Sequence, residues 1–162
     1  QAVYNKIIYA KTAALFETSA YLAGLISTDN TDIHQQLKKF GYHMGMAFQI
    51  QDDLFDYTLE KTTMGKNTGD DFAEGRITLP LIFALQHANN HDKKTLKDLI
   101  HSKDRSNIPI IIEIFSKYRI IDQTKQEINH HIQQAKNKLA IPNNPFIDGL
   151  HEILDFITNR DH

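Results

Sequence analysis

The chain has 162 residues, 41% of them hydrophobic, which is enough to bury one substantial core and predicts a single domain spanning residues 1–162. A net charge of −2 and a pI near 6.5 argue against the basic footprint of a nucleic-acid-binding protein, so no nucleic-acid partner is expected. Zinc and disulfide frameworks are disfavoured because the nine histidines are scattered and cysteine is absent. The longest apolar runs, 77–85 and 108–112, are too short to cross a bilayer, so no transmembrane segment is expected.

Helical periodicity predicts a first helix from Ala2 to about Leu25, in which one charged residue is out of place. Lys11 projects from the same side as four apolar residues of this helix: Tyr4, Ile7, Leu15 and Leu22. A lysine turned towards a core must pair with an anion or extend its ammonium to solvent, because burying an unpaired ammonium is costly. The residues alone leave both interpretations open, an anion ligand and a lysine that reaches solvent at a helix edge.

A second long helix is predicted from about Ile33 to Leu59, after a capping and turn cluster at 27–32. Gly41 and Gly45 are four residues apart in it and therefore thin one helix face. Such a face allows close approach of another helix or of a ligand, and helix packing is the more common reason.

An acidic face is the most informative feature of this second helix. One sector of the helix, about 100° wide, holds four polar residues: Gln49, Asp52, Asp53 and Asp56. Like charges three and four residues apart oppose a helix by a few tenths of a kcal/mol per pair, so a bound cation is expected to offset them. Carboxylates suit Mg²⁺ that keeps waters and takes further ligands from a phosphate. The alternative is a solvated acidic face, which the apolar neighbours, including Phe48 and Phe55, make the weaker interpretation.

A long loop is predicted at 62–76, where Gly65 and Gly69 permit tight backbone turns. Lys66 and Arg76 supply cations with no acidic partner of their own at helical spacing. The loop is not a Walker phosphate loop, because the glycine spacing differs and no strand precedes it. A basic lid over a metal-bound phosphate is the preferred interpretation, and a plain inter-helix loop is the alternative.

The rest of the chain is also helical in pattern, with no convincing strand and no repeat, so the predicted fold class is all-α. Thr78 and Pro80 mark the start of the next helix. Further helices are predicted at about 79–87, 92–101, 108–118, 121–139 and, after a break at 142–145, 146–157.

Four motifs follow one another in a characteristic order. They are Lys11-Thr12-Ala13; Phe48-Gln49 with Asp52-Asp53-Leu54-Phe55-Asp56-Tyr57; Gly65-Lys66-Asn67-x-Gly69-Asp70-Asp71; and Glu74-Gly75-Arg76-x-Thr78-Leu79-Pro80. In this order they resemble the trans-polyprenyl diphosphate synthases, and the third motif is most similar to the octaprenyl type. The resemblance implies an all-α helical bundle of the isoprenoid synthase type and a cytoplasmic enzyme.

The resemblance also implies a chemistry, the Mg²⁺-dependent condensation of an allylic prenyl diphosphate with isopentenyl diphosphate. Two facing aspartate-rich motifs hold Mg²⁺ in this family, and the second of them is matched by Asp52, Asp53 and Asp56. Metals and cations stabilise the departing pyrophosphate, and an apolar cavity shields the allylic carbocation from water.

Binding roles follow from the same match. The lysines that bind the allylic diphosphate are matched by Lys11 and Lys66, and the polar residues beside it by Thr12 and Gln49. Arg76 stands where a lysine is usual, which keeps the charge but changes a compact ammonium into a planar fork. The residues expected to be catalytic are Lys11, Asp52 and Lys66.

One part of the family pattern is missing from this sequence. The first aspartate-rich motif and the residues that hold isopentenyl diphosphate lie upstream of the lysine-threonine motif in the family, and only ten residues precede that motif here. We therefore expect a C-terminal portion of the bundle that lacks its N-terminal helices and is inactive by itself. The missing half would come from an upstream segment or from another chain.

A half bundle would expose apolar faces, so association into a homo-oligomer is also expected. Two alternatives stand beside the prenyltransferase hypothesis. The chain could be a non-catalytic partner subunit or inactive remnant of such an enzyme. The second alternative is class I terpene cyclisation on a similar bundle. The Asn-Ser-Glu metal motif that is usual for that reaction is absent from this sequence.

Overall fold

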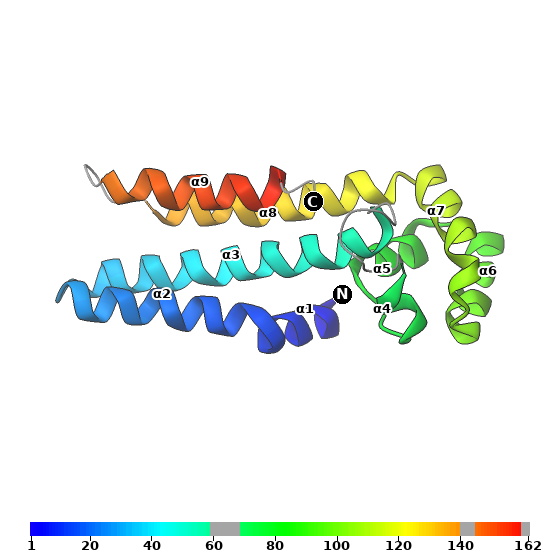
Figure 1. Cartoon of the computed structure of the whole chain (residues 1–162), viewed down its shortest axis with the longest axis horizontal. Coiled ribbons are helices and arrows are strands. Elements are labelled where there is room, and N and C mark those ends of the chain that lie inside the picture. Colours follow the sequence, from blue (N-terminus) through cyan, green and yellow to red (C-terminus); the bar gives the residue numbers. More distant parts are fainter. Residues whose placement is uncertain (59–68, 140–144, 160–162) are drawn as a thin grey trace. The chain divides into compact units, whose positions relative to one another are not determined.

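The computed structural model describes residues 1–58, 69–139 and 145–159, and every regular element within these ranges is helical (Figure 1). The all-α prediction is confirmed. In chain order the elements are α1 (Ala2–Ile8), the π-helical η1 (Tyr9–Ala13), α2 (Ala14–Ser27), α3 (Thr31–Thr58), α4 (Asp70–Ala73), α5 (Leu79–His87), α6 (Asn90–Ser102), the 3₁₀ turn η2 (Arg105–Asn107), α7 (Ile108–Lys117), α8 (Ile120–Lys138) and α9 (Pro145–Asn159). None of the described helices is both long and apolar enough to cross a membrane.

The predicted helices agree with the observed ones to within two residues at each end that the structure describes. Three features were missed. The first predicted helix contains the π-helical segment η1, the predicted loop at 62–76 contains the short helix α4, and the 3₁₀ turn η2 precedes α7. Lys66 falls in the interval between residues 58 and 69 and so lies outside the described residues.

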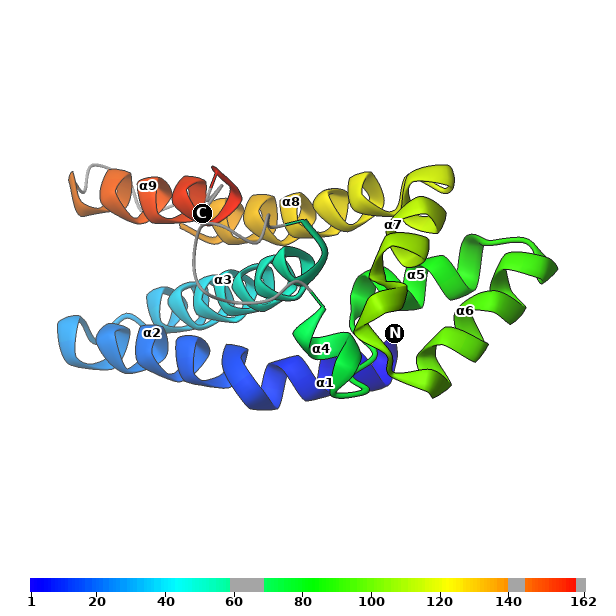
Figure 2. The ribbon, with the colours of Figure 1, turned by 45° about the vertical axis from the view of Figure 1, so that its right-hand side comes forward.

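The helices group into two compact units. Residues 2–51 and 127–161 form the long-helix unit, and residues 52–126 form the short-helix unit. In the long-helix unit α2 runs beside α3, and α8 runs beside α9 (Figures 1 and 2). Lys136 of α8 is joined to Asp155 of α9 by an ion pair of 2.5 Å.

Two glycines set the closest helix contact in the long-helix unit. A Cβ atom added at Gly41 would lie 2.4 Å from the carbonyl oxygen of Phe16, and one at Gly45 would lie 2.6 Å from the Cα of Ala13. Any larger side chain at either position would therefore force η1 and α2 away from α3. The two glycines thus serve helix packing.

A histidine pair joins α3 to α8 in the same unit. The Nδ1 atoms of His43 and His131 are 3.0 Å apart, so one ring donates its N–H and the other accepts it. His131 is 7% exposed, and burial lowers the pKa of each ring to about 4. At His43 the charges of His130 and Lys138 contribute to this lowering of the pKa, after burial. Both rings are therefore uncharged at neutral pH.

The short-helix unit includes α5, α6 and α7 (Figure 2), and these helices have buried apolar side chains of their own. The fully buried side chains among them include Leu79, Leu81, Leu96, Ile111 and Phe115. The rings of Tyr57 and Phe115 lie 5.1 Å apart and attach the end of α3 to α7. Asp92 joins α6 to the end of α7, because its carboxylate accepts hydrogen bonds of 2.7 Å from Lys117 and Tyr118.

The close contact at Gly41 leads to a test with an internal control. We expect Gly41→Ala to lower the free energy of unfolding by about 1–3 kcal/mol, because the new methyl group meets backbone that cannot move aside. Gly149→Ala in α9, where no atom lies within 4 Å of the added Cβ, should instead raise it by about 0.5–1 kcal/mol through helix propensity. Urea unfolding measures both, and equal effects would contradict the packing role.

The histidine pair predicts a loss of stability in acid. Because both pKa values are lowered in the folded state, the unfolded chain binds more protons between about pH 6.5 and 4, and stability falls as the pH falls through that window. The loss should be on the order of 1–3 kcal/mol, reduced by the partial solvent exposure of His43. Unfolding measured across this range should show a shallower slope for His43→Gln than for the wild type. The exposed-site control His91→Gln should keep the wild-type slope.

Candidate functional site

The lysine-threonine motif lies in the π-helical segment η1. The buried side chains of α1 and η1, which are Tyr4, Ile8 and Ala13, are spaced four and then five residues apart, and the wide turn accounts for the longer second step. Of the predicted stripe, Tyr4 is buried, whereas its other members lie on an exposed side of α1 and α2. Lys11 is exposed, and its expected neighbours Ile7, Leu15 and Leu22 are 57%, 72% and 52% exposed.

The same turn brings two predicted site residues together within the long-helix unit. The hydroxyl of Thr12 donates a hydrogen bond of 2.6 Å to the side-chain oxygen of Gln49, across 37 residues of sequence. Gln49 is 3% exposed, so its amide is held in a fixed position on α3. Lys11 extends into solvent beside this contact. Because single π-helical turns often occur at functional sites, the exposed ammonium and the ordered polar pair mark a candidate anion-binding position.

The three aspartates of the acidic motif occupy the end of α3 and differ in environment. Asp52 is exposed, Asp53 is 4% exposed and Asp56 is half-buried. In the described part of the chain, no three acidic or histidine side chains converge closely enough to enclose a metal ion. Mg²⁺ is usually bound by one or two carboxylates together with waters and phosphate oxygens, so the exposed carboxylate of Asp52 suits this ion without an enclosing set of side chains.

Asp56 has contacts that the sequence did not indicate. Its two carboxylate oxygens accept hydrogen bonds of 2.8 and 3.1 Å from the backbone N–H groups of Asp70 and Asp71. Its carbonyl oxygen accepts one of 2.9 Å from the N–H of Gly69. Burial and the charge of Asp71 raise the pKa of Asp56, while the backbone donors oppose that rise. The end of α3 is therefore attached directly to α4.

Arg76 also has partners that the sequence did not predict. Its guanidinium forms ion pairs with Asp71, at 2.6 Å, and with Glu74. Both carboxylates raise the pKa of Arg76, although 57% of its side chain is exposed. Neither partner stands at helical spacing from Arg76, and Asp71 meets it because α4 turns the chain so that residues five positions apart come together. An exposed arginine in such a pair can still exchange partners with an incoming anion.

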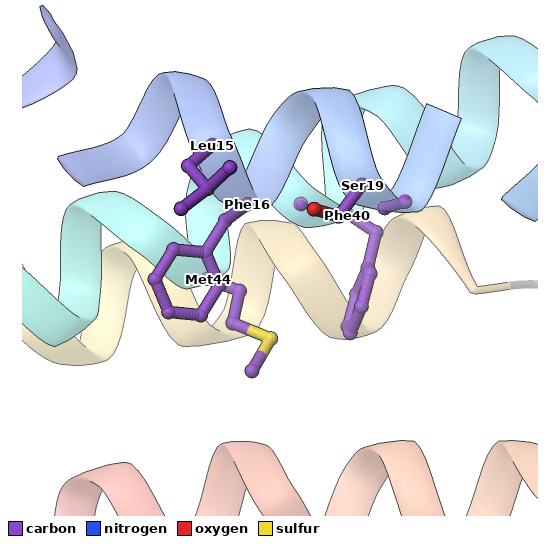
Figure 3. A pocket seen from close by; sticks show the side chains of 7 residues that line it. Leu15, Phe16, Ser19, Phe40 and Met44 are labelled. Carbon is purple, nitrogen blue, oxygen red and sulfur yellow. The ribbon is translucent and has the colours of Figure 1, made fainter. Parts of the chain in front are cut away.

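An apolar groove of about 380 Å³ lies between α2 and α3 in the long-helix unit (Figure 3). Its lining residues are Leu15, Phe16, Ser19, Ala20, Phe40, Gly41 and Met44. In Figure 3 the side chains of Leu15, Phe16 and Met44 gather at one part of the groove, with Phe40 and Ser19 beside them. The ring of Phe48 supports Phe16 at 5.6 Å. The volume lies within the range of small-molecule sites, about 300–1,000 Å³.

Comparison with known proteins identifies the family. Residues 1–117 match the model of the polyprenyl synthetase family, and the chain belongs to that family. It is 32% identical over 142 residues to the octaprenyl diphosphate synthase of Haemophilus influenzae. It is 30% identical over 160 residues to the enzyme of the same name from Escherichia coli.

Solved structures agree with this assignment. A polyprenyl synthase from Caulobacter crescentus, in complex with calcium and isoprenyl diphosphate, matches 100% of this chain with 32% identity and a TM-score of 0.90. A decaprenyl diphosphate synthase from Rhodobacter capsulatus matches 99% of it with 30% identity and a TM-score of 0.89. The predicted family and the isoprenoid synthase type of bundle are confirmed.

The chain spans about half the length of the relatives it matches. The alignment covers 87% of this chain but 43% of the Haemophilus influenzae protein, and 98% of this chain but 50% of the Escherichia coli protein. It covers 50% of the Caulobacter crescentus chain as well. The activity and substrates of the full-length relatives are therefore only proposed for this chain.

Proposed function

We propose that this chain supplies the second aspartate-rich wall of a prenyltransferase that condenses an allylic diphosphate with isopentenyl diphosphate to form a polyprenyl diphosphate. The observation that supports it most directly is the 2.6 Å hydrogen bond between Thr12 and Gln49. It joins two motifs from distant parts of the sequence and leaves the ammonium of Lys11 in solvent next to them.

The charge of each side chain decides its proposed ligand. Lys11 binds the allylic diphosphate, and the Thr12 hydroxyl and the Gln49 amide orient it. Asp52, Asp53 and Asp56 are the carboxylates that would hold Mg²⁺. When bound, that ion would stabilise the negative charge that develops on the departing diphosphate.

Two more cations belong to the same proposal. Arg76 reaches the diphosphate by exchanging its exposed ion pairs for the anion, and its planar fork offers two parallel hydrogen bonds. Lys66, outside the described residues, is proposed as a further diphosphate ligand from the sequence match alone. The proposed catalytic groups of this chain are Lys11, Asp52 and Lys66.

The groove between α2 and α3 is proposed as the site of the isoprenoid tail. It begins at Leu15, one helical turn beyond Lys11, so a ligand whose diphosphate meets Lys11 can extend its apolar part along α2. An apolar wall there would exclude water from the reacting end.

We further propose that another polypeptide segment completes the bundle. Large apolar side chains are exposed along α1 and α2, among them Val3, Ile7, Leu15 and Ile26, at 57% to 88% of their surface. A relative from Bacillus subtilis, 32% identical over 158 residues, is named heptaprenyl diphosphate synthase component 2, which favours an assembly from more than one chain as one possibility. A homo-oligomer or a chain carrying the first aspartate-rich motif would both cover this surface.

A thermal-stability measurement tests the proposed anion and metal site. Mg²⁺ and pyrophosphate together should raise the melting temperature of the wild-type chain, and either alone should raise it less. Asp52→Asn and Lys11→Gln should each abolish most of the rise, because one removes a metal ligand and the other a diphosphate ligand. The controls Asp98→Asn and Lys94→Gln, on α6, should respond like the wild type. No rise in a folded wild-type sample would favour the non-catalytic alternative.

A second measurement tests the groove. In the presence of Mg²⁺, the wild-type chain should bind farnesyl diphosphate more tightly than pyrophosphate, because the tail buries apolar surface. Ser19→Phe places a ring at the rim of the groove and should remove this difference without changing pyrophosphate affinity. Thr18→Phe puts the same ring on an exposed position outside the groove lining and serves as the matched control. Calorimetric titration that finds equal farnesyl diphosphate affinity in both variants would overturn the assignment.

A further inference from the structure

We infer that Asp56 is a positioning residue, whose carboxylate caps α4 and thereby sets the place of Arg76. This role is distinct from metal binding. Its consequence for diphosphate binding rests on the proposed function, whereas the cap itself does not.

The backbone of α4 needs a cap from elsewhere in the chain. The N-cap residue of α4 is Gly69, which has no side chain to accept the first backbone N–H groups of the helix. Gly69 has a φ of 84°, a conformation that favours glycine. A Cβ atom there would also lie 2.6 Å from the side chain of Ile108. The usual capping residues Ser, Thr, Asp and Asn are therefore disfavoured at position 69, both by the backbone conformation and by the side chain of Ile108.

Asp56 supplies what Gly69 cannot. Its carboxylate oxygens accept the N–H groups of Asp70 and Asp71, the first two residues of α4, and its carbonyl oxygen accepts that of Gly69. Three successive backbone donors thus end on one residue of α3. Hydrogen bonds from backbone N–H groups to a carboxylate are stronger than neutral ones, and the half-buried position of Asp56 strengthens them further.

The position of Arg76 follows from that of α4. The backbone N–H of Arg76 donates to the carbonyl oxygen of Asp71 at 2.8 Å, and its guanidinium pairs with the carboxylate of the same residue. Asp71 in turn is held by Asp56. Arg105 pairs with the carboxylate of Asp70 and secures the other side of α4. One short run of contacts therefore leads from the acidic motif on α3 to the cation that is proposed to meet the diphosphate.

Two readouts test this role, and the first needs no ligand. In the metal-free chain, amide hydrogen exchange followed residue by residue should be about 10- to 100-fold faster at Asp70 and Asp71 in Asp56→Ala and Asp56→Asn, as expected for losing a hydrogen bond to a charged group. Asp52→Asn and Asp98→Asn should leave these rates unchanged. Wild-type rates in a folded Asp56→Ala chain would overturn the cap.

The second readout asks whether Asp56 acts through Arg76. Pyrophosphate affinity in the presence of Mg²⁺ is measured for Asp56→Asn, Arg76→Gln and the double variant. If Asp56 positions Arg76, the loss caused by Asp56→Asn should shrink at least severalfold when Arg76 is already absent. Two losses that simply multiply would reject the positioning role and leave Asp56 as a metal ligand only. If the wild-type chain bound no pyrophosphate, the proposed function would fail, and the exchange rates would still decide the cap.

Discussion

The close approach of η1 and α2 to α3 is the constraint on which the long-helix unit depends. It exists because Gly41 and Gly45 present no side chain where the backbone of Phe16 and the Cα of Ala13 must pass. The short distance between the helices is what allows Thr12 to reach Gln49, and Gly41 is also one of the residues that line the apolar groove. Gly41 therefore belongs both to the helix contact and to the groove that is proposed to bind the isoprenoid tail.

The π-helical turn adds a second condition to this contact. A regular helix through residues 2–27 could not bury both Ile8 and Ala13 against the same neighbour and also keep Lys11 in solvent, because 3.6 residues per turn fixes their relative directions. One wide turn resolves the conflict. The cost of its weaker hydrogen bonding is offset by the burial of Tyr4, Ile8 and Ala13, and the result is an exposed cation beside an ordered polar pair.

Helix existence and order could be predicted from the sequence, since apolar periodicity and capping residues determine them locally. The family could be predicted as well, from four motifs in register, and the comparisons confirm it. The π-helical turn at η1 could not be predicted, because it changes the phase of the helix without leaving a mark in composition. Nor could the partners of Asp56 and Arg76, because both depend on α4, a helix of four residues that is too short to have a periodicity of its own.

At the acidic end of α3, neighbouring carboxylates are stabilised by hydrogen-bond donors and cations of the chain itself. The carboxylate of Asp56 accepts two backbone N–H groups, Asp71 is paired with Arg76, and Asp70 is paired with Arg105, so three acidic groups have positive or N–H partners before any metal is considered. Asp52 differs from them in being exposed at the surface of the helix. Because a hydrated Mg²⁺ gives up its waters reluctantly, an exposed carboxylate is the one that such an ion meets first. The division between the carboxylate that organises the backbone and the one that faces solvent therefore follows from burial, and it explains why one acidic motif can serve both the fold and the proposed site.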